Sequence, residues 1–205
     1  MRTILRLTAS PRGSQANSHR FSDQLIARLK ARHPGAELID RDLSSNPPPL
    51  IDAGFSAAIL GTADRSSPAL RESERLIAEL ENTDALVIAT PMHNFSTPAV
   101  LKAWIDQIVR IHRSFGSTPQ GKVGLLSDRP VYLVLASGGW FTDAAPIEAP
   151  RQPDFLTPYL STVLNTIGLR DLHIFALEGL ARGDAMRDAA FARAEAALNA
   201  LLPLP

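Results

Sequence analysis

The sequence predicts an α/β fold in which a mainly parallel sheet of five strands is covered by helices on both faces. Short β-rich runs alternate with longer segments of helical periodicity, which is the pattern of successive βαβ units. Two of the strand-like runs are almost continuously apolar, as strands buried on both faces of a parallel sheet are. The 205 residues contain no internal repeat or low-complexity linker, so we expect a single domain spanning 1–205.

The two continuously apolar runs are 131–136 and 172–177, whereas 37–42 alternates apolar with charged residues and suits a sheet edge. The complete set of predicted strands is Thr3–Thr8, Glu37–Asp42, 85–89, Val131–Ala136 and Leu172–Leu177. Arg6 lies inside the first strand, which should be central, and an unpaired charge is expensive to bury there. We therefore expect either a carboxylate partner for Arg6 or a local distortion of the strand.

Apolar residues at intervals of three and four predict five helices that pack on this sheet. In the first helix Phe21, Leu25 and Leu29 recur every four residues, and the fourth helix is followed by Gly168, a residue typical of a C-terminal cap. The predicted helices are Asn17–Arg32, about 70–80, about 100–109, Leu156–Ile167 and 186–202. Residues 46–67 show only weak periodicity, and excursions of this length often carry function.

The composition excludes several classes of function. Lys and Arg together number 21, as do Asp and Glu, so no net charge attracts the chain to nucleic acid or to an anionic membrane. There is no cysteine, which excludes disulfides and thiol nucleophiles, and no pair of the scattered histidines has metal-ligand spacing. Redox chemistry would therefore need an organic cofactor. Nothing resembles the Gly-x-Ser-x-Gly motif of hydrolases.

We also expect a soluble, cytoplasmic protein. Met1 leads directly into the first predicted strand, and no run of 18 apolar residues is present that would span a bilayer.

Ligands of open α/β sheets bind beyond the carboxyl ends of the strands, and three segments of this sequence meet that edge. The first segment, 10–18, is a small, hydroxylated loop that runs into the first helix. Backbone N–H groups at the helix N-terminus, with Ser10, Ser18 and Arg12 nearby, favour a phosphate. The alternative is an N-capped helix that simply follows a flexible turn.

The other two segments suit a flat ligand. In the segment 90–98, Met92 and Phe95 are expected beside an aromatic ring system, with backbone groups of His93 and Asn94 at its polar edge. Ser96 or Thr97 is expected to cap the next helix. In the segment 136–141, paired glycines allow close backbone approach. The alternatives are a partly exposed loop histidine at position 93 and a merely flexible Gly-Gly turn.

These residues carry a family resemblance that spans nearly the whole chain. Met92, His93, Asn94 and Phe95 match the Met-Tyr-Asn-Phe flavin loop of the FMN-dependent NADH-azoreductases, also described as NADH:quinone oxidoreductases. Further matches are Gly138 and Gly139, the run from Thr157 to Leu160 with Gly168, the stretch 42–49, and Glu178 with Gly179. The resemblance implies a flavodoxin-like three-layer sandwich with strand order 2-1-3-4-5.

The resemblance further implies an enzyme that passes two electrons from NADH or NADPH through FMN to a small aromatic acceptor, a quinone or an azo compound, with ping-pong kinetics. The implied FMN-binding residues are Ser10, Ala16, Asn17, Ser18, Met92, His93, Asn94, Phe95, Ala136, Ser137, Gly138 and Gly139. Phe115 is implied in the acceptor pocket, and the family's homodimers place the stretch 46–67 near the subunit interface.

The sequence departs from the family at two positions of the implied site. His93 replaces the usual tyrosine, and Ala136 with Ser137 replaces a Ser-Arg pair. Backbone contacts to a flavin do not depend on these side chains, so FMN binding is expected to survive both changes. His93 is the candidate proton donor, and no catalytic triad is assigned.

Two other functions are compatible with the same fold. One is a flavodoxin-type electron carrier, although such carriers usually present a strongly acidic docking face and this sequence has no acidic run. The other is a flavin-free regulatory domain, because a fold alone does not determine a function.

Overall fold

Five parallel strands form one continuous sheet in the computed structural model, which describes residues 1–61 and 67–203. The strands are β1 (Thr3–Thr8), β2 (Glu37–Asp42), β3 (Ala85–Pro91), β6 (Val131–Ala136) and β7 (Leu172–Leu177). They lie in the order β2-β1-β3-β6-β7, and every neighbouring pair is parallel. Since β6 and β7 are the fourth and fifth predicted strands, the predicted order 2-1-3-4-5 is confirmed.

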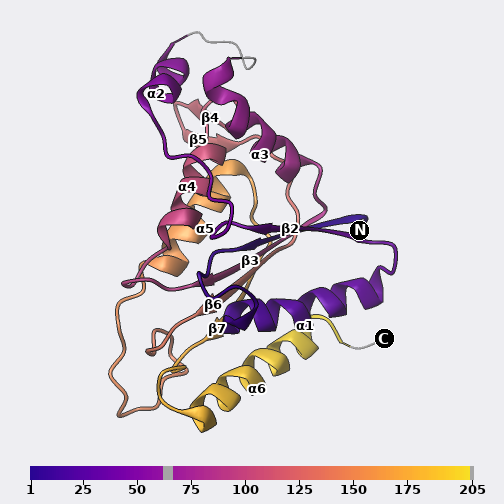
Figure 1. Ribbon diagram of the computed structural model, residues 1–205, viewed down its shortest axis with the longest axis vertical. Helices are drawn as coiled ribbons and strands as arrows, with labels where there is room; N and C mark the ends of the chain where they lie inside the picture. The colour runs from indigo at the N-terminus through magenta and orange to yellow at the C-terminus, as the bar shows by residue number, and fades with distance from the viewer. Residues whose placement is uncertain (62–66, 204–205) are drawn as a thin grey trace.

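Helices cover both faces of the sheet, as predicted (Figure 1). One face carries α1 (Asn17–Arg32) and α6 (Asp184–Leu201), and the other carries α3 (Arg71–Glu81), α4 (Ala99–Ile108) and α5 (Leu156–Ile167). The bounds of α1 and α5 agree with the prediction, whereas α6 begins two residues before the predicted 186. None of the described helices combines the length and the apolar character needed to cross a membrane.

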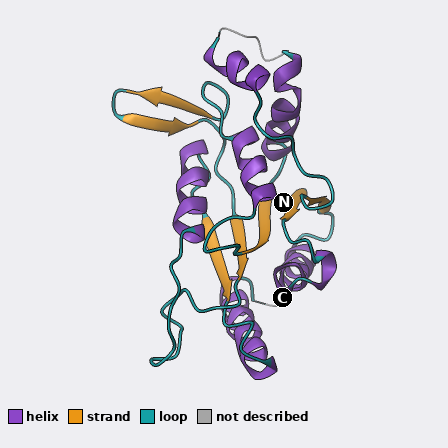
Figure 2. Cartoon of the chain, turned by 60° about the vertical axis from the view of Figure 1, so that its left-hand side comes forward, coloured by secondary structure: helices purple, strands orange, loops and turns teal. Residues whose placement is uncertain are grey.

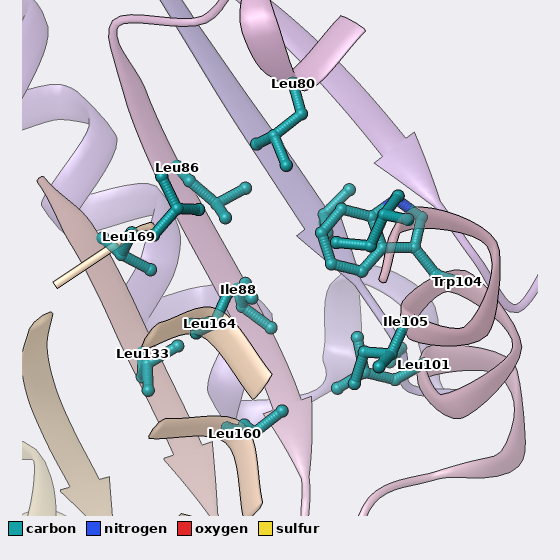
Figure 3. Packing of buried hydrophobic residues seen from close by; sticks show 14 of the residues in the cluster. Leu80, Leu86, Ile88, Leu101, Trp104, Ile105, Leu133, Leu160, Leu164 and Leu169 are labelled. Atoms are coloured by element: carbon teal, nitrogen blue, oxygen red, sulfur yellow. The ribbon is translucent and has the colours of Figure 1, made fainter. Parts of the chain in front are cut away.

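Each face of the sheet has its own hydrophobic core. On the α3, α4 and α5 side, the fully buried Trp104 packs in a cluster with Leu80, Leu133 and Leu160 (Figure 3). On the α1 and α6 side, the rings of Phe21 and Phe175 lie 5.4 Å apart between centroids. Burial on both sides explains why β6 reads as an almost continuous apolar run; β1 and β3 are buried in the same way.

The expectation that residues 172–177 are buried on both faces is wrong. The strand β7 is the last in the sheet, and Ile174 is 43% exposed. Its apolar sequence therefore does not distinguish an edge strand from a central one. The edge position predicted for 37–42 is confirmed, since β2 ends the sheet on the other side.

Arg6 has carboxylate partners, so the first of the two expectations for it is confirmed. Its side chain is buried on the α1 face of β1, where Nε donates to Asp40 Oδ1 at 2.9 Å and Nη1 donates to Asp23 and to Ser22 Oγ. Burial alone lowers the pKa of Arg6, but the hydrogen bonds to Asp40 and Asp23 outweigh it and raise the pKa above its usual value. The charge thus ties β1 to β2 and to α1.

Several short elements escaped prediction. Within 46–67 the structure forms α2 (Ala53–Leu60), whose Asp52 accepts a capping hydrogen bond from Phe55 N at 2.7 Å; positions 62–66 of this stretch lie outside the described residues. Only Phe55 of this helix is buried, so it has no apolar stripe to detect. A separate hairpin, β4 (Phe115–Thr118) with β5 (Gly121–Gly124), projects from the body (Figure 2). Two 3-10 turns, η1 (Gly13–Gln15) and η2 (Pro68–Leu70), complete the chain.

Candidate functional site

A cavity of about 310 Å³ opens at the carboxyl ends of the strands. Its lining comes from the segments that follow β1, β3, β6 and β7, because parallel neighbours all end at the same edge. The lining residues are Ser10, Arg12, Ala16, Asn17, Ser18, Pro91, Met92, Ala136, Ser137, Gly138, Leu180 and Ala181. The three predicted segments therefore meet in one site, with a fourth beside them.

The β1–α1 segment gives the cavity an electropositive end. The turn η1 leads to α1, whose N-cap Ala16 offers no side-chain oxygen. In the described part of the chain no side chain caps this helix, and its first turn holds no acidic residue. The alternative of an ordinary N-capped helix is therefore wrong. Uncapped N–H groups and the helix dipole, with Arg12 on the same lining, favour an anion here.

The β3–α4 segment forms a tight turn in an uncommon backbone conformation. Asn94 and Phe95 have φ values of 48° and 72°, and His93 and Ser96 exchange two backbone hydrogen bonds of 2.9 and 3.0 Å across the turn. Non-glycine residues in this region are strained, and such strain gathers at functional sites. The predicted cap from Ser96 or Thr97 is wrong, because Pro98 occupies the N-cap position of α4.

The β6 and β7 segments are joined by backbone hydrogen bonds behind the cavity. Ser137 N donates to Leu177 O at 2.8 Å, and Leu180 N donates in turn to Ser137 O at 3.1 Å. Gly138 allows this approach, because a Cβ there would lie 3.2 Å from the Cβ of Ala181. The glycine pair is therefore held by tertiary contacts, and the alternative of a merely flexible turn is wrong.

Glu178 anchors the segment that follows the glycine pair. Its side chain is buried and its carboxylate accepts from Phe141 N at 2.7 Å, from Thr142 N at 2.9 Å and from the Thr142 hydroxyl. A buried carboxylate is tolerated only with such partners. The sequence motifs did not place Glu178, Leu180 and Ala181 at this edge. The general rule that all parallel strands end at the same edge would have included them, since they follow the last strand.

Not every predicted residue lines the cavity. Of the twelve implied FMN-binding positions, eight do so. The other four are His93, Asn94 and Phe95, which follow the lining residue Met92, and Gly139, which follows Gly138. Phe115 lies elsewhere, buried at the start of β4 with Lys122 Nζ 5.2 Å from its ring centroid.

Comparison with known proteins decides the family. Residues 2–202 match a family model described as a flavodoxin-like fold. FMN-dependent NADH:quinone oxidoreductase 4 of Pseudomonas fluorescens is 48% identical over 204 residues, covering 100% of this chain and 97% of that protein. This chain belongs to the FMN-dependent NADH:quinone oxidoreductase family. A second member, FMN-dependent NADH:quinone oxidoreductase 5 of Burkholderia lata, is 46% identical over 98% of this chain and 96% of its own length.

Solved structures agree with the fold of this oxidoreductase family member. An azoreductase from Bacillus anthracis superposes with a TM-score of 0.80 over 98% of both chains, at 23% sequence identity. At that level of identity the likeness supports the flavodoxin-like architecture alone.

Gly179 provides a test of how the segment after β7 is held. Its φ is 73°, and a Cβ would lie 2.6 Å from the indole ring of Trp140. We expect Gly179→Ala to lower the free energy of unfolding by about 2 to 5 kcal/mol, from the left-handed conformation and from the clash with Trp140. Urea denaturation monitored by circular dichroism measures this loss.

Gly13→Ala is the matched control. Gly13 also has a positive φ, 52°, but no atom lies within 4 Å of a Cβ built there, so only the conformational loss of about 1 to 2 kcal/mol is expected. Equal losses in the two variants would show that the Trp140 contact contributes nothing.

Proposed function

We propose that this protein is an FMN-dependent oxidoreductase that takes two electrons from NADH or NADPH and delivers them to a quinone or an azo compound. The observation that carries the proposal is the match to the Pseudomonas fluorescens enzyme across the entire chain, together with a cavity built from the residues predicted for FMN. Residues 1–205 would then form a single FMN-binding domain.

The cavity fits FMN at both ends. We assign the phosphate to the α1 end, where Asn17 and Ser18 begin an uncapped helix and Arg12 adds a cation. We assign the flavin ring to the end between Met92 and Gly138. The side chain of Met92 is apolar and polarizable, and Gly138 has no side chain. A volume of about 310 Å³ lies within the usual range for small-ligand sites.

FMN supplies the redox chemistry when bound, since it can take a hydride from a nicotinamide and give two electrons to an acceptor. The protein binds and orients FMN. The nicotinamide donor and the acceptor would then use the cavity one after the other. His93, which is exposed beside Met92, is the proposed proton donor. With no Arg at position 137, the family's basic side chain is missing from this wall.

Absorption spectroscopy and steady-state kinetics test the proposal directly. We expect purified protein to bind FMN, identified after heat release, and its visible absorption to bleach with NADH or NADPH and to return with a benzoquinone. Parallel-line kinetics would follow from alternating use of the cavity. Protein that binds FMN but shows no quinone reduction would favour the electron carrier instead, and protein that takes up no FMN would favour the flavin-free regulatory domain.

Asn17→Asp tests the assignment of the phosphate. A carboxylate in the first turn of α1 is favourable for the helix dipole but repels a phosphate at the same N-terminus. We expect FMN to bind at least about tenfold more weakly, while the unfolding midpoint of the flavin-free protein stays the same or rises. Fluorescence titration of flavin-free protein measures the affinity.

Gln24→Glu is the control for this variant, because it adds the same charge to an exposed position of α1 that does not line the cavity. A similar loss of affinity in both variants would contradict the assignment, since net charge alone would then explain it.

We further propose a cytoplasmic homodimer whose interface includes α2 and the segment before it. Leu50 and Leu60 are 78% and 86% exposed, and large exposed apolar side chains in one region favour an interface. Phe115 stays proposed as part of the acceptor pocket. We expect sedimentation equilibrium to give a dimer mass, and Leu50→Asp with Leu60→Asp to give a monomer. Leu201→Asp, on α6, should leave the dimer intact, because α6 and α2 lie at opposite ends of the view in Figure 1.

A further inference from the structure

Gln152 bridges two sides of the cavity without lining it. Its Nε2 donates to Ser137 Oγ at 2.8 Å and to Met92 Sδ at 2.9 Å. Met92 follows β3 and Ser137 follows β6, so one amide group connects the two segments between which the flavin ring is assigned. No residue type or spacing in the sequence pointed to Gln152.

The bridge determines what the Ser137 hydroxyl can do. A serine hydroxyl has one hydrogen to donate and two lone pairs to accept with. Ser137 Oγ accepts from Gln152 Nε2 and also from Gly139 N at 3.2 Å, so both lone pairs are engaged. Ser137 is buried against the protein and lines the cavity. The hydroxyl therefore has only its hydrogen left to offer to a ligand.

The same amide restrains Met92. A methionine side chain has three rotatable bonds and adapts to almost any neighbour, so it positions a ligand only when something fixes it. The contact from Gln152 to the sulfur supplies that restraint. A hydrogen bond of an amide to a thioether is weak, but it acts together with the stronger bond to Ser137.

Gln152 itself is held in place from behind. Its backbone N donates to Trp140 O at 2.8 Å, and Glu178 holds the two residues that follow Trp140. Gly139 leaves room for the amide, since a Cβ there would lie 2.5 Å from Gln152 Oε1. Gly139 therefore makes room for the Gln152 side chain rather than contacting a ligand directly.

We propose that Gln152 is a positioning residue for the flavin: it makes Ser137 an obligatory hydrogen-bond donor to the bound isoalloxazine and holds Met92 against the ring. The inference rests on the proposed function and adds to it a residue outside the cavity. In this chain Gln152 and Ser137 together provide a neutral donor at the position where the family usually has arginine.

Two substitutions of Gln152 distinguish a role in positioning the flavin from a role that only links the two segments of the protein. Gln152→Leu removes both donated hydrogen bonds, and we expect FMN to bind about three- to tenfold more weakly. Gln152→Glu keeps a hydrogen bond to Ser137 but reverses it, so that Ser137 donates to the carboxylate and no longer to the flavin. Like Gln152→Leu, it loses the donor to Met92 Sδ. We expect it to weaken FMN binding at least as much as Gln152→Leu, whereas a structural role limited to the link with Ser137 would survive this change.

The measurements are fluorescence titration of flavin-free protein with FMN, the visible absorption maximum of the bound flavin, and the unfolding midpoint of the flavin-free variants. The absorption maximum should shift in both variants and in Ser137→Ala. The unfolding midpoints should stay within a few degrees of the wild type, which separates loss of positioning from loss of folding. Gln24→Leu, on the exposed face of α1, is the control and should match the wild type in all three.

A double-mutant cycle completes the test. If Gln152 acts through Ser137, the combined Ser137→Ala and Gln152→Leu variant should lose less affinity than the sum of the two single losses. Additive losses, or wild-type FMN affinity in Gln152→Leu, would overturn this inference while leaving the proposed function intact. Wild-type protein that fails to bind FMN would instead overturn the proposed function, and this inference with it.

Discussion

The strands β1, β3 and β6 lie side by side, run parallel and are buried on both faces, and the position of every other functional element depends on this arrangement. Parallel pairing requires each strand to be followed by a crossover, which places helices on the two faces of the sheet. It also brings the carboxyl ends of neighbouring strands to the same edge. The cavity exists because four chain segments leave the sheet there in close succession.

The segments at this edge are held more tightly than loops at a surface usually are. Two of them contain features that would be unfavourable alone. The segment after β3 has positive φ values at Asn94 and Phe95, and the segment after β7 has a buried carboxylate at Glu178 and a left-handed glycine, Gly179, against Trp140. These features are stable because hydrogen bonds from neighbouring segments compensate for them. A site built this way presents backbone and side-chain donors in fixed positions before any ligand binds.

The backbone around positions 93 and 137 is held by main-chain hydrogen bonds that do not depend on the side chains at these two positions. By the family resemblance, His93 and Ser137 replace a tyrosine and an arginine. The turn at 93–96 is closed by backbone hydrogen bonds, and the β6 and β7 segments are paired through their backbones. Ser137 accepts a hydrogen bond from Gln152, which lies 15 residues further along the chain.

The sequence by itself determined the five strands, the five large helices and the three segments that meet at the cavity, because periodicity, a helix-ending glycine and glycine pairs act over short distances along the chain. It did not determine that β7 is an exposed edge, that Arg6 is paired with Asp23 and Asp40, or that α2 forms within 46–67. Those outcomes depend on which residues become neighbours in space. The same is true of Gln152, since a glutamine at a loop position has no local signal, and only the packed structure brings its amide to Met92 and Ser137.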